Sequence, residues 1–410
     1  MNRLVSLKKD TMKTSEFEQH MEEVKTTIKR YREVEKSEEL KAYYDLKKIV
    51  ETPEFQQKKN FLLKRKYRET EEGKTMRAYR RARLFPSTRF YLSREQSQRK
   101  DSWLGKKLQA WRLSLGPVRE YLRLDPIVKS EEFQERNEFW KNPRRWYTTP
   151  ESKQDERLAE LKKSEDIHFF LAQDPKQIEY YESYKTLWTD EMDWMMMKDG
   201  DWKPGFYYTN KNLKTDHSYF NEQQANNKGM NSAAVNSVLT VEVKPEFVGA
   251  APAWHPTKGF VTKEYSYTGD VIQTANAFST NEGLFLAKVR AEGKAHVALY
   301  LAAGDRLPLL TLMHWNGENV TMGMKTQKTE SKATIKDLNA KNWMIYGLQI
   351  TDKELIWSIN GQEVNREANT LKDAKWYPAV SAYLPEGIKP SVGQIDIDWI
   401  RVYKQENKKK

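Results

Sequence analysis

The sequence predicts a multidomain protein in which an all-α half built from helical repeats precedes an all-β sandwich. Up to about residue 187 the chain has few glycines, many charged side chains, and apolar residues three or four positions apart, which is typical of helices. From Trp188 onward, glycine, asparagine and threonine become frequent and short alternating apolar runs appear, which is typical of strands. A chain of 410 residues is long enough for two or three domains.

Helix-start signals recur in the first half. Each consists of a Ser or Thr followed by Pro or an acidic residue. The hydroxyl can accept a hydrogen bond from a free amide of the first turn, and the helix dipole favours an acid there. The signals are "SEEL" at Ser37, "TPEF" at Thr52, "SEEF" at Ser130, "TPES" at Thr149 and "SEDI" at Ser164. We expect each of them to begin a helix.

These signals belong to an internal duplication. Residues 41–62, "KAYYDLKKIVETPEFQQKKNFL", align with residues 119–140, "REYLRLDPIVKSEEFQERNEFW". The matched positions are largely apolar, and Phe55 corresponds to Phe133. Two copies of a helical unit are therefore expected to share one packing scheme, with both phenylalanines in equivalent core sites.

The domain boundaries follow from these patterns. Residues 1–187 are expected to form a basic helical domain with two repeats, at about 37–95 and 115–174. Residues 188–404 contain short runs such as "VLTVEV" and "IDIDWIRVY" separated by Asn-Gly turn signals, and they are expected to form the sandwich. Residues 405–410 are a basic tail.

Composition excludes several classes of protein. Cysteine is absent, which rules out disulfides and zinc–thiolate sites. There is no apolar run of 18 residues and no apolar signal-peptide core, so neither a membrane span nor a secretory signal is expected. The sequence therefore predicts a cytoplasmic protein or a virion component. The overall layout resembles proteins of gut Bacteroidota and their phages.

Seven pieces of the β half, in order, resemble glycoside hydrolase family 16, whose members include laminarinases and lichenases with a concanavalin-like β-jelly roll. The pieces span about residues 188–404. They are "WTDEMDW" (188–194), "VNSVLTVEV" (235–243), "YTGDVIQTANAF" (267–278), "EGLFLAKVR" (282–290), "HVALYLAAGD" (296–305), "YGLQITDKELIWSINGQEV" (346–364) and "IDIDWIRVY" (395–403). The resemblance implies a jelly-roll fold and, in an intact family member, hydrolysis of β-glucans.

The catalytic carboxylates of that family are missing from the matching strand. The family reads G-E-I-D-I-x-E after the piece that resembles "HVALYLAAGD", and this chain reads "PLLTLMH". The resemblance places the nucleophile at Leu309, the intervening Asp at Thr311 and the acid/base at His314, or at Met313 in the shorter variant. A retaining glycosidase needs two carboxyl groups about 5 Å apart, so these residues predict a pseudoenzyme.

Two further departures from the family's pattern point the same way. Leu286 replaces a family Glu in "LFLA", and Gln349 and Ile350 stand where the family has the Glu and Trp of "LEW", which suggests that polar groups of the cleft have become apolar together. Alternation along "LPLLTLMHW" puts Leu309 on the cleft floor, where open exposure would forfeit apolar burial. We therefore expect the former cleft to be filled or covered, with weak sugar affinity.

Four aromatic residues are candidate glycan contacts: Trp254, Tyr300, His314 and Trp315. Each also has a structural interpretation. Trp254, expected in a Pro-rich loop, can cover the sandwich edge, Tyr300 can belong to the core, and His314 with Trp315 can be a strand-end pair. No metal site and no cofactor are predicted, and a structural Ca²⁺ stays open as an alternative.

The excess positive charge is uneven. The formal net charge is +12, and residues 61–100 hold 13 basic and 4 acidic side chains. Arg77, Arg80, Arg81, Arg83 and Arg89 form a candidate polyanion patch, although a solvated helix face is the favoured explanation for them. The interleaved aromatics there fit the apolar positions of the repeat.

The leading hypothesis is a catalytically inactive, glycosidase-like protein that binds other protein subunits of a larger assembly. Its jelly roll would offer a protein- or glycan-interaction surface. Two alternatives remain: an active endo-β-glucanase, and a polyanion- or nucleic-acid-binding protein that acts through its helical half. No membrane partner is expected.

Overall fold

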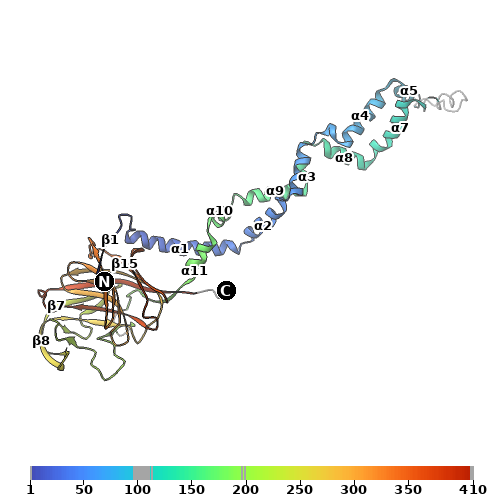
Figure 1. Ribbon diagram of the computed structural model, residues 1–410. Coiled ribbons are helices and arrows are strands. Elements are labelled where there is room, and N and C mark those ends of the chain that lie inside the picture. Colours follow the sequence, from blue (N-terminus) through green and yellow to red (C-terminus); the bar gives the residue numbers. More distant parts are fainter. Residues whose placement is uncertain (1, 96–110, 112–113, 195–196, 198–199, 407–410) are drawn as a thin grey trace. The chain divides into compact units, whose positions relative to one another are not determined.

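The computed structural model confirms the fold class, with helices followed by a β-sandwich (Figure 1). It describes residues 2–95, 111, 114–194, 197 and 200–406. The connection between the predicted repeats and the end of the basic tail lie mostly outside these residues. In the described part of the chain, no helix combines the length and the apolar composition that a bilayer crossing requires.

The helical elements follow the predicted start signals. They are α1 (Thr14–Glu35), α2 (Glu38–Val50), α3 (Pro53–Lys64), η1 (Tyr67–Glu69), α4 (Glu71–Leu84), α5 (Pro86–Glu95), α7 (Gly116–Lys129), α8 (Glu131–Lys141), η2 (Arg145–Thr148), α9 (Pro150–Leu161), α10 (Glu165–Ala172) and α11 (Pro175–Glu182). The hydroxyls of Ser37, Thr52, Ser130 and Thr149 each accept a hydrogen bond from an amide of the first turn. Ser164 occupies the cap of α10 without such a bond.

The two repeats contain the same elements in the same order, namely two helices, a short 3₁₀ turn and two more helices. Besides contacts between consecutive helices, the two repeats pack on each other. The first helix of repeat one, α2, lies against α9 of repeat two, and α4 of repeat one lies against α7 of repeat two. Figure 1 shows this as a chain that runs out along α2–α5 and returns along α7–α10.

This pairing of helices from the two repeats creates two similar hydrophobic cores. One contains Phe55 together with Trp146, and the other contains Phe133 together with Tyr79. Phe55 is 8% exposed and Phe133 is 3% exposed. Both phenylalanines are thus buried at matching positions. The backbone amide of each is bonded to the capping hydroxyl three residues earlier.

The chain divides at other places than the sequence predicted. One unit holds residues 29–173, and the other holds residues 1–28 together with 174–410. These compact units differ from the predicted boundary at 187/188 and from a wholly helical N-terminal domain. The physical reason is that β1 (Asn2–Ser6) pairs in parallel with β14 (Glu330–Lys336), so the first residues of the chain belong to the β unit.

The remaining strands build two sheets. They are β2 (Tyr184–Asp190), β3 (Lys203–Pro204), β4 (Ser218–Tyr219), β5 (Ala225–Asn226), β6 (Ser232–Val235), β7 (Val238–His255), β8 (Gly259–Gly269), β9 (Val271–Gln273), β10 (Gly283–Gly293), β11 (His296–Ala303), β12 (Leu309–Trp315), β13 (Val320–Lys325), β15 (Met344–Ile350), β16 (Glu354–Ile359), β17 (Gln362–Ala368), β18 (Trp376–Tyr383) and β19 (Gly393–Gln405).

One sheet has the strand order β1-β14-β13-β12-β11-β18-β9-β3, and the other has the order β17-β16-β15-β10-β19-β7-β8-β5. Their facing sides bury a single large core that includes Phe285, Tyr346, Trp357 and Trp376. Burial alternates along most strands, as expected when one face of a sheet packs on another sheet. The outer face of the first sheet carries the site described below.

The start of α1 covers the outer face of the second sheet. Phe17 and Met21 pack on a cluster that contains Leu286, Ile345 and Trp399. Leu286 therefore lies beneath the helix and not in a cleft, which corrects the interpretation of this residue as a lost cleft group. The sequence could not show which sheet face would receive the helix.

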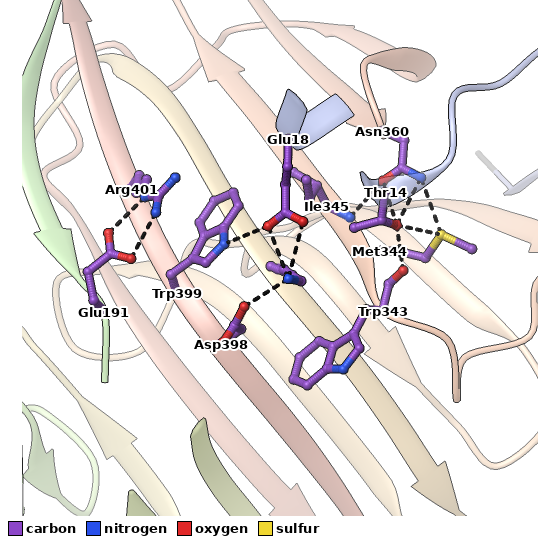
Figure 2. A network of polar contacts seen from close by, with 11 residues as sticks. Thr14, Glu18, Glu191, Trp343, Met344, Ile345, Asn360, Asp398, Trp399 and Arg401 are labelled. Atoms are coloured by element: carbon purple, nitrogen blue, oxygen red, sulfur yellow. Dashed lines mark hydrogen bonds and ion pairs between the residues drawn. The ribbon is translucent and has the colours of Figure 1, made fainter. Parts of the chain in front are cut away.

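Polar contacts fix the same segment (Figure 2). The Thr14 hydroxyl donates to the carbonyl of Trp343 at 2.6 Å, and the Asn360 amide donates to the carbonyl of Met12 at 2.9 Å. Asn360 also accepts from the backbone amide of Ile345 at 2.8 Å. The first 28 residues are thus an integral part of the β unit.

Candidate ligand-binding site

Leu309, Thr311 and His314 lie on one face of β12 and line one pocket. The pairing of β12 with β13 shifts register between Thr311 and His314, and Leu312 and Met313 both turn into the core. This bulge decides between the two alignments considered from the sequence, because it brings His314 rather than Met313 to the pocket. None of the three pocket-facing side chains is a carboxylate.

The pocket has a volume of about 440 Å³ and lies on the outer face of the first sheet. Strands β11 to β14 and β18 form its floor, and the segment 206–224 forms one wall. The expected filling of the cleft is not seen at this pocket, which segment 206–224 bounds on one side. Leu309 is half-buried, packed in a cluster with Tyr300 and Tyr377, so its apolar surface is largely covered from within the same chain.

His314 is held in a hydrogen-bonded group of ring side chains. Its Nδ1 lies 3.2 Å from the Thr321 hydroxyl, and its Nε2 lies 3.2 Å from His296 Nδ1 and 3.3 Å from the Tyr383 hydroxyl. Burial, assisted by His296 and Lys332, lowers the pKa of His314 to about 3. The imidazole is thus neutral at pH 7 and is not a source of protons for a leaving group.

Glu222 is a pocket residue that sequence reasoning missed. Its Oε2 accepts from the backbone amide of Tyr219 at 2.8 Å and from the side-chain amide of Gln224 at 3.1 Å. The nearby Lys263 ammonium bonds to the carbonyls of Phe220 and Glu222 rather than to the carboxyl group. Burial raises the pKa of Glu222 to about 8, so the side chain is mostly protonated at neutral pH.

Two other acids line the pocket, and their carboxylates are bonded to backbone amides or paired with lysines. Asp270 is buried, and its carboxylate accepts the backbone amides of Asn227, Gly229 and Asn231. It thereby fixes the loop that follows the pocket wall. Glu330 lies 3.8 Å from the Lys325 ammonium and 3.6 Å from that of Lys332.

Arg306 is the second pocket residue that the sequence did not indicate. It follows β11 and adopts a positive φ of 81°. Its guanidinium carbon lies 4.5 Å from the ring centre of Phe206 and 4.1 Å from that of Tyr219. No motif marks Arg306 or Glu222, because their roles depend on how two loops lie over the sheet.

Of the aromatic residues predicted to contact glycan, Tyr300 and His314 line the pocket, whereas Trp254 and Trp315 do not. Trp254 lies in β7 and not in a loop. It is 38% exposed and makes an edge contact with Phe260 in the neighbouring strand. The Trp315 indole donates to the carbonyl of Gly293 at 2.9 Å, which is a structural role.

The predicted polyanion patch lies on α4 and α5, where all five arginines are exposed: Arg77, Arg80, Arg81, Arg83 and Arg89. Phe85, at the junction of these helices, is 49% exposed rather than part of the repeat core. Across the described residues, no group of three or more His, Asp and Glu side chains is arranged to hold a metal ion.

No protein-family model matches the sequence, and no curated protein matches it. Solved structures do match. The laminarinase catalytic domain from Thermotoga maritima MSB8 has a TM-score of 0.44 and 16% identity, covering 55% of this chain and 99% of that one. The laminarinase from Rhodothermus marinus has a TM-score of 0.43 and 17% identity, covering 55% and 98%. SCLam, a non-specific endo-β-1,3(4)-glucanase of family GH16, has a TM-score of 0.43 and 18% identity, and the match covers 55% of this chain and 92% of that one.

Proposed function

We propose that the β unit is a non-catalytic glycan-binding module. The observation that carries this proposal is the set of side chains that β12 presents to the pocket, namely Leu309, Thr311 and His314. A leucine cannot attack a sugar, and a neutral histidine with a strongly lowered pKa is a poor proton donor.

The acids of the pocket do not replace the missing pair. A retaining mechanism requires a nucleophilic carboxylate about 5–5.5 Å from a protonated one. Glu222 supplies a protonated carboxyl group, but the carboxylate of Asp270 is engaged by backbone amides and that of Glu330 is paired with two lysine ammonium groups, so neither is free to attack a sugar. Among the described acids that line the pocket, the protonated carboxyl group of Glu222 therefore has no free nucleophilic carboxylate as a partner.

The pocket nevertheless suits a sugar. Its volume of about 440 Å³ is within the range of small-molecule sites, and it combines aromatic faces with convergent polar groups. Tyr300 and Tyr219 offer rings, while Glu222, Thr311 and Tyr383 offer hydrogen-bonding groups. Stacking faces and hydrogen bonds are the two features that saccharide recognition needs.

Two measurements test the proposal. Isothermal titration with β-1,3- and mixed-linked glucan oligosaccharides should show binding that Tyr300→Ala weakens and Trp254→Ala leaves unchanged, because only Tyr300 lines the pocket. A reducing-sugar assay on laminarin, lichenan and agarose should show no release. Release by the native chain above that of Glu222→Gln, which lacks the pocket's protonated carboxyl group, would overturn the non-catalytic assignment.

A second candidate function belongs to the helical unit. Exposed aromatic and basic side chains alternate near the junction of α4 and α5, with Phe85 between Arg83 and Arg89. Such a surface favours a polyanion, since cations bind phosphate or sulfate groups and rings stack on bases. A test by substitution of three arginines is given in the Discussion.

The helical unit is also our candidate for attachment to other protein subunits. Large apolar side chains are exposed on it, including Tyr147 at 58% and Leu84 at 59%. Apolar surface of this kind often marks a protein interface. Complexes purified from the native source through a tagged chain should lose defined partners on Tyr147→Ser or Leu84→Ser; unchanged composition with both variants would argue against this surface.

A further inference from the structure

Arg306 is a cation that lines the pocket. Among the residues that the structure describes, no Asp or Glu oxygen forms an ion pair with its guanidinium, which lies over the rings of Phe206 and Tyr219. The carboxylate of the adjacent Asp305 accepts the backbone amide and the hydroxyl of Thr209 at 2.6 and 3.1 Å.

In this arrangement the contacts of the guanidinium are with ring faces, which leaves its N–H groups to donate hydrogen bonds to a ligand. Burial lowers the pKa of Arg306, which shows that its charge is partly removed from water. Stacking on rings engages the plane of the group, while its N–H donors point outward within that plane. A partly buried charge with free donors is costly until an anion meets it, and two parallel N–H···O bonds suit an oxyanion best.

The acids that line the pocket are protonated or engaged by neighbours, and the carboxylate of Asp270 accepts the backbone amides of Asn227, Gly229 and Asn231. Glu222 is mostly protonated at neutral pH, and His217, His296 and His314 all have pKa values lowered by burial. Lys325 and Lys332 stand at the pocket rim beside Glu330. The Tyr219 ring contacts Arg306, and its backbone amide bonds to Glu222, so the cation and the protonated acid flank the same residue.

We propose that the saccharide bound in this pocket is acidic, and that Arg306 holds its oxyanion, which is either a uronate carboxylate or a sulfate ester. The proposal rests on the glycan-binding function proposed above and adds the class of sugar. A protonated Glu222 can donate a hydrogen bond to the same anion, which an ionised acid could not do.

Calorimetric titration with three tetrasaccharides tests this inference: a neutral laminaritetraose, an oligogalacturonate and a sulfated carrageenan fragment. At least one acidic sugar should bind about tenfold or more tightly than the neutral one, and Arg306→Gln should remove that difference. The acidic sugar that binds identifies the oxyanion. Arg366→Gln is the matched control, because this exposed arginine pairs with Glu354 and Glu363 outside the pocket.

Other outcomes separate this inference from the proposed function. Equal binding of neutral and acidic sugars, unaffected by Arg306→Gln, overturns the acidic-sugar inference and leaves glycan binding intact. No binding of any of the three overturns both. If Arg306→Gln fails to fold, the native chain still decides the matter, since its affinity for the acidic sugar should fall as NaCl is raised while that for a neutral sugar should not.

Discussion

Lys288 of β10 binds Glu18 of α1 at 3.0 Å and Asp398 of β19 at 2.9 Å, so a single ammonium joins the N-terminal helix to the sheet beneath it. The Trp399 indole donates to the same glutamate at 3.3 Å (Figure 2). The two carboxylates outweigh the effect of burial and raise the pKa of Lys288. Residues far apart in the sequence are thereby fixed at one point.

Glu18→Gln should lower the free energy of unfolding of the β unit by about 1 kcal/mol, because a partly shielded ion pair and a charged hydrogen bond are both weakened. Urea unfolding followed by tryptophan fluorescence measures this change. Glu33→Gln is the control, since it removes the same charge from an exposed position of the same helix. Equal effects of the two variants would mean that the contact with Lys288 contributes nothing.

The duplicated helical unit makes a paired prediction. Phe55→Ala and Phe133→Ala should each cost about 3–5 kcal/mol, because both rings are buried in matching cores. Ile49→Ala and Ile127→Ala are matched controls: they occupy equivalent repeat positions but are 45% and 43% exposed. Thermal unfolding of the four variants should show a large loss of stability for each phenylalanine variant and a small loss for each isoleucine variant. A large loss at only one phenylalanine would refute the equivalence of the two core sites.

The repeat could be predicted because its signals are local. Capping hydroxyls such as Thr52 and Ser130 act on amides three residues away, and apolar spacing reports the buried face of the same helix. The strand β12 could likewise be aligned, and its pocket-facing set of Leu309, Thr311 and His314 lies together in the structure. What the sequence left open was the bulge that selects His314 over Met313.

The rest of the site depends on long-range placement. Glu222 and Arg306 lie in loops with no periodicity, and they become pocket residues only because segment 206–224 crosses the sheet. Leu286 follows the same alternation as a cleft residue would, yet its face of the sheet is covered by α1. Strand β1 is five residues long and pairs in parallel with a distant strand, which local patterns do not report.

Glu222 gives the β unit a predictable pH dependence. Its folded-state pKa of about 8 is above the ordinary value of 4.5, so its contribution to stability is fully present below about pH 4.5 and is lost as pH rises toward 8. Lys263 of β8 weakens this shift but does not reverse it, and Gln224 acts in the same direction as Lys263. The neighbouring tyrosines, Tyr265, Tyr300 and Tyr383, all have raised pKa values and stay neutral through this range.

Glu222→Gln should therefore gain stability relative to the native chain as pH rises. Urea unfolding at roughly pH 5, 7 and 9 should show a difference that grows in that order, since glutamine cannot ionise. Glu264→Gln is the control, because it makes the same chemical change at an exposed position of β8. A difference for Glu222→Gln that stays constant from pH 5 to 9, or that only follows the control, would contradict the raised pKa of Glu222.

The arginine patch yields the last prediction. The triple variant Arg77→Gln, Arg80→Gln, Arg81→Gln should elute from heparin at lower salt than the native chain, because fewer counterions are released when fewer cations meet the polymer. The control triple is Arg123→Gln, Arg157→Gln, Arg366→Gln, which changes the net charge equally but removes arginines that already pair with glutamates. Those pairs are exposed and contribute little stability, so both triple variants should fold.

The two triple variants then differ in where the removed charges lie and in whether those charges were paired with an acid. An exposed cation without a neighbouring acid attracts a polyanion more strongly than one that is already neutralised, so the first variant should show the larger shift in elution. Phe85→Ser tests whether this ring stacks on nucleic-acid bases. The variant should elute earlier than the native chain from a column of single-stranded DNA, but not from heparin, which has no bases. Equal shifts for both triple variants would show that retention follows net charge alone, and that α4 and α5 carry no specific site.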